Sequence, residues 1–161
     1  MKRGMVMERA SGVLLPIFSL PSKYGIGCFS KEAYQFIDRL KAAGQSYWQI
    51  LPLGPTGYGD SPYQSFSTFA GNPYFIDLET LTGEGLLTAQ ECEYGCEGIR
   101  EDKIDYEKIY KTRFQILEKA FSRFGENDEY RAFVSENQFW LEDYSPVSYT
   151  HLRAHETKAN L

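Results

Sequence analysis

The stretch that decides the fold is Ile50-Leu-Pro-Leu-Gly-Pro-Thr-Gly-Tyr-Gly-Asp-Ser-Pro-Tyr-Gln-Ser65. It begins with a short apolar run. The rest contains three glycines and two prolines. These rule out a regular helix or central strand, because glycine loses the most backbone entropy on folding and proline has no N–H. The stretch is therefore predicted to form a loop, and the side chains it displays are Tyr58, Asp60, Ser61, Tyr63 and Gln64.

The displayed side chains combine aromatic faces with hydrogen-bonding groups. This combination suits sugars, whose C–H faces stack on aromatic rings while their hydroxyls need paired donors and acceptors. Loops rich in Gly, Pro, Ser and Asp are also common as plain surface turns. The residue types alone leave both interpretations open.

The residues before the loop predict a strand, a helix and a second strand. Ser11–Ile17 and Ser46–Leu51 are short runs typical of buried strands in a parallel sheet. Between them, Ser30 is a predicted N-cap, Glu32 suits the positive helix start, and Gly44 is placed to end the helix. Such a βαβ unit is expected to have a right-handed crossover. The loop then follows the second strand, where parallel α/β folds assemble their ligand sites.

Further elements are predicted after the loop. Gly71–Leu78 is expected to be extended, because Pro73 disfavours helix at the preceding residue. Thr88–Glu91 has the form of a capping box, and a long helix is predicted from about Asp105. A last helix begins at Asn127 or Asp128. Apolar residues at helical spacing are expected in the core: Tyr106, Ile109, Tyr110, Leu117, Ala120, Phe121 and Phe124 in the first of these two helices, and Tyr130, Phe133, Val134, Trp140, Leu141 and Tyr144 in the second.

The composition is that of a globular protein, with 161 residues, 42% hydrophobic and 24% charged. The aromatic share of 16% suits either a binder of flat apolar surfaces or an aromatic core. The formal net charge is −5 and the pI is about 5.1. There is therefore no basic field to attract nucleic acid or an anionic membrane, and neither is expected as a partner.

The three cysteines, Cys28, Cys92 and Cys96, form no disulfide framework and lack the second ligand pair of a zinc site. They are predicted to be reduced thiols. Val13–Leu20 is too short to span a bilayer and has no cleavage site after it. His151 and His155 lack the glutamate of the His-Glu-x-x-His pattern, so no metal is predicted.

Several long motifs together resemble the amino-terminal part of the 4-α-glucanotransferases called amylomaltase or disproportionating enzyme. The resemblance covers about residues 10 to 144. It rests on Leu51-Pro-Leu-Gly-Pro-Thr-Gly-Tyr-Gly-Asp-Ser-Pro-Tyr-Gln-Ser65, Phe69-Ala-Gly-Asn-Pro-Tyr74, Ile76-Asp-Leu78, Gly12-Val-Leu-Leu-Pro16, Ser22-Lys-Tyr-Gly-Ile-Gly27 and Ile104-Asp-Tyr106. The fold it implies is α/β, a partial (β/α)8 barrel with inserted helical segments, truncated after about two βα units.

The resemblance also implies an activity. Such enzymes act in the cytoplasm without a cofactor, and move a segment of an α-1,4-glucan onto the 4-hydroxyl of another glucan. They use an aspartate nucleophile and a glutamate acid/base, which is the retaining scheme. In the family these carboxylates lie on later strands, so no catalytic residue is expected in this chain, and the chain alone is expected to be inactive.

The family's substrate contacts carry over by position. Tyr63 is similar to the tyrosine that stacks on the sugar at the cleavage subsite, with Ser61 beside it. Tyr58 resembles part of an accessory glucan-contact surface together with Tyr106. Asp60 is interpreted as a residue that fixes the loop by bonding backbone N–H groups, and Gln64 as a donor or acceptor to a sugar hydroxyl.

Residues 145–161 match nothing in the family pattern, and Pro146 is expected to break the preceding helix. They are predicted to be an unrelated or disordered tail. Two other functions stay open: a carbohydrate-binding domain without catalysis, and a hydrolase of the α-amylase superfamily. The burial of the strand residues distinguishes a self-contained carbohydrate-binding domain from an incomplete barrel. A complete domain would cover its own strand residues Val13, Leu14, Ile50 and Leu51.

Overall fold

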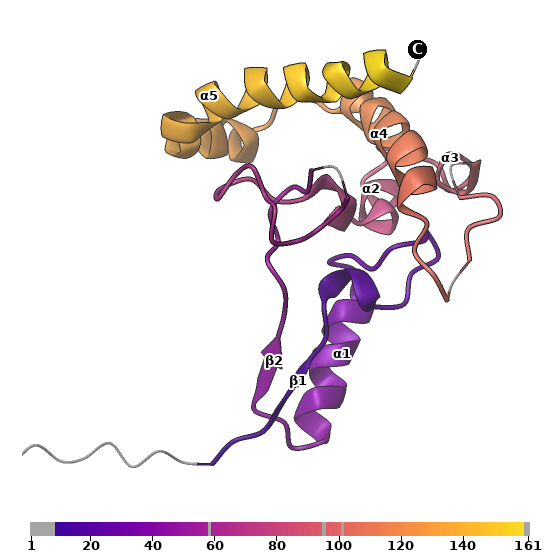
Figure 1. Cartoon of the computed structure of the whole chain (residues 1–161), viewed down its shortest axis with the longest axis vertical. Helices are drawn as coiled ribbons and strands as arrows, with labels where there is room; N and C mark the ends of the chain where they lie inside the picture. Colours follow the sequence, from indigo (N-terminus) through magenta and orange to yellow (C-terminus); the bar gives the residue numbers. More distant parts are fainter. Residues whose placement is uncertain (1–8, 58, 95, 101, 160–161) are drawn as a thin grey trace, which may run out of the picture.

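The computed structural model describes residues 9–57, 59–94, 96–100 and 102–159, with side chains up to residue 146. A small βαβ unit lies at one end of the molecule and a group of helices at the other (Figure 1). The loop that follows the second strand lies between the βαβ unit and the last helix. The fold is therefore of the mixed α/β class.

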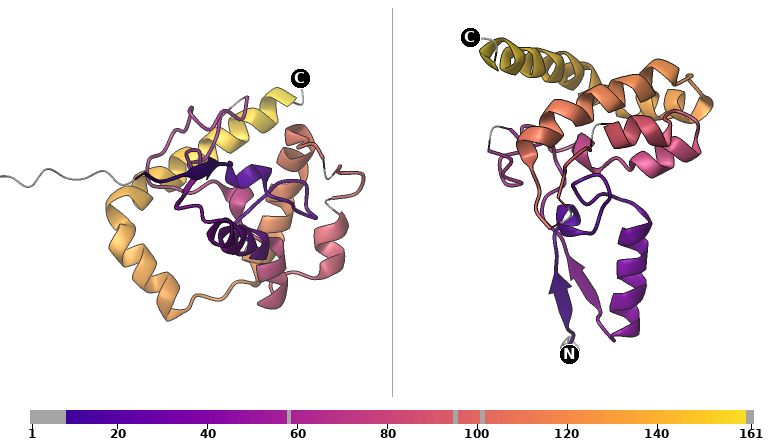
Figure 2. Two further views of the ribbon diagram at one scale, coloured as in Figure 1. Left: turned by 90° about the horizontal axis from the view of Figure 1, so that it is seen from below. Right: turned by 90° about the vertical axis from the view of Figure 1, so that its right-hand side faces the viewer.

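The βαβ unit confirms the predicted strand, helix and strand. Strands β1 (Gly12–Leu14) and β2 (Tyr47–Gln49) pair in parallel, with Val13 opposite Trp48. Helix α1 (Lys31–Ala42) connects them and lies along their side (Figure 2). Ser30 caps α1, because its Oγ accepts a 3.3 Å hydrogen bond from Glu32 N. Gly44, at a φ of 70°, ends it in the left-handed conformation that glycine adopts freely.

The helices after the loop are short except for the last two. They are the 3₁₀ helix η2 (Pro73–Phe75), then α2 (Leu78–Gly83), α3 (Ala89–Tyr94), α4 (Tyr106–Arg123) and α5 (Asp128–Ala159). Another 3₁₀ helix, η1 (Ile17–Ser19), follows β1. The capping box is confirmed: Glu91 Oε2 accepts from Thr88 N at 3.0 Å, and Thr88 Oγ1 accepts from Glu91 N at 3.3 Å.

The expectation that residues 71–78 are extended is wrong over much of its length. Asn72 Oδ1 accepts from Tyr74 N at 3.0 Å, and Pro73 occupies the first position of η2, where no N–H is needed. Asp77 caps α2 by accepting from Glu79 N at 3.2 Å. The two side-chain caps favour helical turns on either side of a short extended joint.

Two clusters of buried residues hold these elements together. The first joins the segment after β1 to α1, η2 and α4; its buried members are Ile17, Leu20, Ile26, Ala33, Tyr74, Phe75 and Ile109. The second joins α2, α3 and α4 through Leu78, Leu87, Cys92, Ile116 and Ala120. Helix α4 contributes to both, so it is the element that connects the βαβ unit to the helical part.

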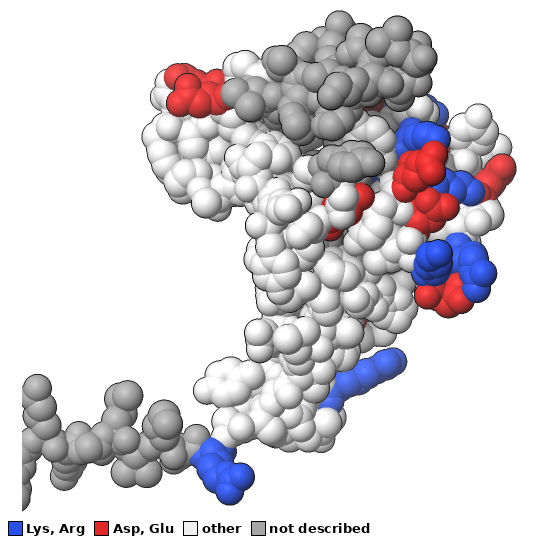
Figure 3. Space-filling model, in the orientation of Figure 1, with Lys and Arg blue, Asp and Glu red and all other residues white. Residues whose placement is uncertain are grey.

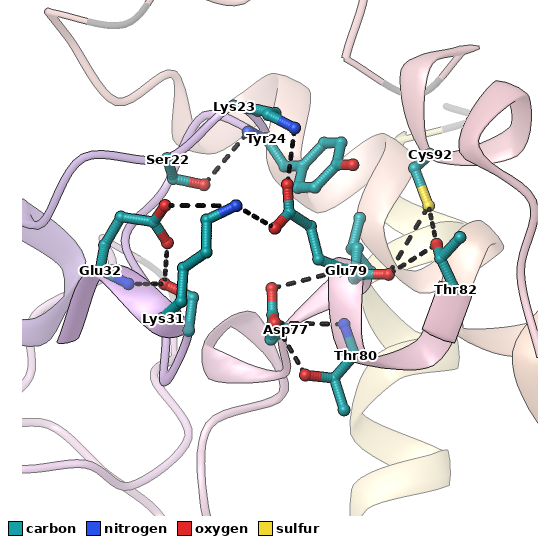
Figure 4. A network of polar contacts seen from close by, with 12 residues as sticks. Ser22, Lys23, Tyr24, Lys31, Glu32, Asp77, Glu79, Thr80, Thr82 and Cys92 are labelled. Carbon is teal, nitrogen blue, oxygen red and sulfur yellow. Dashed lines mark hydrogen bonds and ion pairs between the residues drawn. The ribbon is translucent and has the colours of Figure 1, made fainter. Parts of the chain in front are cut away.

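An ion-pair network reinforces the contact between the βαβ unit and α2 (Figure 4). The Glu79 carboxylate lies 2.6 Å from Lys23 Nζ and 2.8 Å from Lys31 Nζ. These two bonds hold the loop before α1 and the start of α1 against α2. As predicted, the cysteines are free thiols: Cys28 and Cys92 are buried and Cys96 is half-buried.

The predicted core stripes of the two long helices are only partly right. In α4, Ile109 and Ala120 are buried as expected, but Phe121 is 73% exposed, and the buried Arg113 and Ile116 were not predicted. Among residues 128–146 of α5, no side chain is buried. Helical spacing predicts which residues share a face, but whether another element covers that face depends on tertiary packing.

Helix α5 also continues past the residue where it was expected to end. Asn127 caps it, with Oδ1 accepting from Tyr130 N at 2.8 Å, and Pro146 lies inside it. A proline removes one intrahelical hydrogen bond and clashes with the carbonyl four residues before it, which kinks a helix without always ending it. Figure 2 shows the ribbon of α5 turning part-way along its length. Whether residues 145–161 are foreign to the family stays a prediction.

The strand residues chosen as a test of completeness are not covered. Val13 is 37%, Leu14 57% and Ile50 37% exposed, while Leu51 is half-buried. Over the strands the surface carries few charges, whereas charged side chains gather beside the helical part (Figure 3). The side chains of Val13, Leu14 and Ile50 are thus open to solvent. Within the described ranges, no helix is both long and apolar enough to cross a membrane.

Candidate functional site

The predicted loop after β2 is confirmed, and its two arms are tied together at the base. Thr56 and Ser65 form an isolated antiparallel bridge. Leu53 O accepts a 2.8 Å hydrogen bond from Asn72 N, which fixes the start of the loop to the segment before η2. Pro55 is buried. The loop therefore projects from an anchored stem, and the residues between 56 and 65 form its tip.

Asp60 shapes the tip through its backbone and its side chain. Its φ of 51° lies in the left-handed region, which aspartate tolerates better than most residues, and its N–H donates to Gly57 O at 3.1 Å. Its carboxylate accepts a 3.3 Å hydrogen bond from Thr56 Oγ1. The loop-fixing bond thus comes from a hydroxyl and not from the backbone N–H groups that we expected. Partial burial raises the pKa of Asp60, and the bond from Thr56 opposes this rise.

The other predicted contact residues differ in their exposure. Tyr63 is 73% exposed and Gln64 is also exposed, while Ser61 is half-buried and its carbonyl accepts from Gln64 N at 3.1 Å. Tyr58 lies outside the described residues. The exposed ring of Tyr63 next to the amide of Gln64 provides one stacking face and one set of hydrogen-bonding atoms.

The remaining predicted contact residue, Tyr106, lies far along the chain from the loop. It is half-buried at the start of α4. Its pKa is raised by burial and then by the negative charge of Asp60. The buried Tyr74 also has a raised pKa for these two reasons, burial first. The negative charge of Asp60 therefore acts on both Tyr74 and Tyr106.

A second aromatic group lies beside the loop and was missed from the sequence. Residues 65–69 face α5 across an open hollow of about 540 Å³. The rings of Phe69 and Trp140 stack with centroids 5.8 Å apart, and those of Phe66 and Tyr144 with centroids 6.2 Å apart. Trp140 and Tyr144 had been assigned to a core stripe. The available signal was the density of aromatic residues in two separate segments, which cannot by itself show that the segments meet.

Around Asp60, the described residues show no sign of a paired carboxylate. A second carboxylate close to Asp60 would raise its pKa, yet burial is the only cause of a rise found among the described residues. Retaining glycoside chemistry needs two carboxyl groups about 5 Å apart. Nor do the described residues include any cluster of three or more His, Cys, Asp or Glu suited to hold a metal ion.

Comparisons with known proteins agree on one family. The family model described as 4-alpha-glucanotransferase, of glycoside hydrolase family 77, matches residues 15–161. A 4-alpha-glucanotransferase of Streptococcus pneumoniae is 53% identical over 138 residues, which is 84% of this chain and 27% of that protein. One from Thermus thermophilus is 45% identical over 147 residues, covering 88% and 28% of the two chains.

A solved structure is similar as well. The amylomaltase from Streptococcus agalactiae, in complex with acarbose, matches with a TM-score of 0.73 and 42% sequence identity, over 84% of this chain and 27% of that one. The chain therefore belongs to the 4-alpha-glucanotransferase family. It spans about a quarter of the length of the curated relatives that it matches.

Proposed function

We propose that this chain supplies part of the glucan-binding surface of a 4-α-glucanotransferase. The observation that carries the proposal is the anchored loop after β2, which holds Tyr63 73% exposed with Gln64 beside it. Tyr63 stacks on a sugar ring, and Ser61, Gln64 and Asp60 bond hydroxyls or keep the loop in shape. Tyr58 and Tyr106 belong to an accessory contact for the same α-1,4-glucan.

The βαβ unit is proposed to be the first part of a (β/α)8 barrel. Its strands are parallel and joined by α1, as in every unit of such a barrel. The exposure of Val13, Leu14 and Ile50 supports this, because neighbouring strands of a closed barrel would cover them. The same exposure weighs against a self-contained carbohydrate-binding domain, which would bury its own strand residues.

The proposed reaction of the whole enzyme is a retaining transfer. One carboxylate attacks the anomeric carbon and holds the glycosyl part covalently, while an acid protonates the leaving oxygen. The residue that acted as the acid, now a base, then activates the 4-hydroxyl of an acceptor glucan. Both carboxyl groups are proposed to come from the part of the relatives that this chain does not span. What this chain contributes is orientation of the donor sugar.

A chimeric enzyme tests the proposal. Residues 10–144 of this chain replace the matching part of the Streptococcus pneumoniae enzyme, and transfer is measured from the chain lengths formed from maltotriose. We expect an active chimera, with kcat/KM at least about tenfold lower in Y63A, because a stacking face is lost. Y34A is the matched control, since Tyr34 is 69% exposed on α1, away from the loop. Equal activity of both variants would refute the assignment of Tyr63.

A further inference from the structure

Aromatic side chains line much of the hollow between residues 65–69 and α5. Phe69 stacks on Trp140 at an interplanar angle of 19° and meets Phe139 edge-on, with centroids 5.3 Å apart. Tyr144 lies 5.8 Å from Trp140. Phe69 remains 60% and Phe139 71% exposed. Much of this aromatic surface is thus in contact with water, although the rings are held in place by one another.

The other side chains that line the hollow are polar. Ser65 and Ser67 use their hydroxyls to hold the loop: Ser65 Oγ donates to Ser67 O at 2.7 Å, and Ser67 Oγ accepts from Ala70 N at 3.0 Å. Thr68 and Asp143 also line the hollow. Within the described part of the chain, neither of these two side chains has a hydrogen-bond partner. The lining of the hollow therefore offers a hydroxyl and a carboxylate to a ligand.

This chemistry favours a sugar over an apolar peptide or helix. A carboxylate in the lining penalises a purely apolar occupant, since burying the carboxylate without a partner is costly. A carbohydrate provides the hydroxyl donors that Asp143 and Thr68 lack and the C–H faces that stack on Phe69 and Trp140. The volume of about 540 Å³ suits a small ligand. The lining of the hollow also begins at Ser65, the residue that follows Gln64.

We propose that this aromatic hollow is an additional glucan-binding site, which holds a short stretch of an α-1,4-glucan against Phe69 and Trp140. The identity of the sugar rests on the proposed function of the adjacent loop, but the site itself is separate from Tyr63. Residues 65–69 and α5 form both walls, so a bound glucan would bridge two segments far apart in the sequence. Such a site would retain a long glucan chain near the enzyme between transfers.

Fluorine NMR of the 161-residue chain labelled with fluorotryptophan tests this directly. The chain has two tryptophans. Trp140 reports on the hollow. Trp48 lies on β2, and because its Nε1 donates to Leu15 O at 2.8 Å, it reports on the βαβ unit. The W140F variant assigns the two resonances. We expect maltoheptaose to shift the Trp140 resonance saturably and to leave that of Trp48 in place. Cellohexaose, the β-linked control, should shift neither.

Variants separate this site from the tyrosine loop. F69A is expected to weaken the binding seen at Trp140 by about tenfold, because one stacking ring is lost. D143N, which keeps the shape of the side chain, should weaken it about fivefold, because a hydrogen bond to a neutral group contributes less than one to a charged group. Y63A should leave it unchanged. If F69A also displaces the Trp48 resonance, its folding is altered. The effect of D143N on binding at Trp140 then serves as the test of the proposed site.

Three results would overturn the proposal: no shift of Trp140 with maltoheptaose, an equal shift with cellohexaose, or equal weakening by Y63A and F69A. The first would mean that another part of the parent protein, and not a glucan, covers the hollow. The chimera assay has a different readout, so failure of the Tyr63 assignment there leaves the Trp140 result interpretable. If glucan binds at Trp140 but Y63A has no effect on transfer, the proposed site in the hollow stands and only the proposed role of Tyr63 is refuted.

Discussion

Replacing Gly54 by alanine should loosen the stem of the tyrosine loop. An added Cβ at Gly54 would overlap Ser65 Oγ and lie 2.9 Å from Ser65 Cβ and 3.0 Å from Ser67 O. Carbon atoms do not approach one another this closely without displacing something. Since Ser65 forms the bridge with Thr56, the residue that must move is the one that closes the loop.

The expected decrease in the free energy of unfolding of G54A has two components. Overpacking a tight contact costs about 1–3 kcal/mol. Turning the Ser65 side chain away breaks its 2.7 Å hydrogen bond to Ser67 O, which costs about 1 kcal/mol more. The free energy of unfolding of G54A should therefore be lower than that of the wild-type chain by about 2–4 kcal/mol.

Urea denaturation followed by circular dichroism measures this difference. G71A is the matched control, because Gly71 is exposed and an added Cβ there meets nothing within 4 Å; it should change stability by less than about 0.5 kcal/mol. Adding S65A to G54A removes the worst overlap and should recover part of the loss. If G54A were as stable as G71A, the close contact at the base of the loop would be disproved.

Two further predictions concern the helical part. L78A should lower the free energy of unfolding by about 2–5 kcal/mol, because Leu78 is fully buried in the second cluster. L14A is the control and should cost far less, because Leu14 is 57% exposed. Equal losses of stability in the two variants would contradict the assigned core. Hydrogen bonds from Arg123 and Thr88 lower the pKa of Glu91 from 4.5 to about 2. The folded state thus holds the ionised form more strongly than the unfolded state does, so its stabilising effect is full above about pH 4.5 and is lost as the pH falls toward 2. Urea midpoints against pH should therefore fall less steeply over that range in E91Q than in the wild type, and parallel curves would refute the bond to Arg123.

Local signals in the sequence were enough to place most elements. Ser30 and Gly44 bounded α1, Thr88 and Glu91 started α3, and the glycine-rich stretch after β2 formed a loop. These features depend on bonds between residues close in the chain, which is why residue type and spacing predict them. The turns at η2 were missed because two side-chain caps, Asn72 and Asp77, outweighed the extended preference before Pro73.

Features that depend on distant segments could not be predicted. Helical spacing placed Phe121 and Trp140 in the core, yet Phe121 is 73% exposed and Trp140 faces an open hollow. Arg113 is buried, donating to Tyr24 O at 3.1 Å, although a charged residue is expected at the surface. The electrostatic influence of Asp60 on the pKa of Tyr106 likewise depends on where α4 packs. The sequence therefore indicated the tyrosine loop but not the aromatic hollow beside it.

The most direct test of the central claim is to incubate the purified 161-residue chain with maltotriose and to resolve the products by length. The proposed role of the chain is to orient glucans, while the two carboxyl groups that break and remake the glycosidic bond come from elsewhere in the parent enzyme. The expected result is that no glucans longer or shorter than maltotriose form. A ladder of maltodextrins that persists after repurification would contradict it and would place catalysis within this chain.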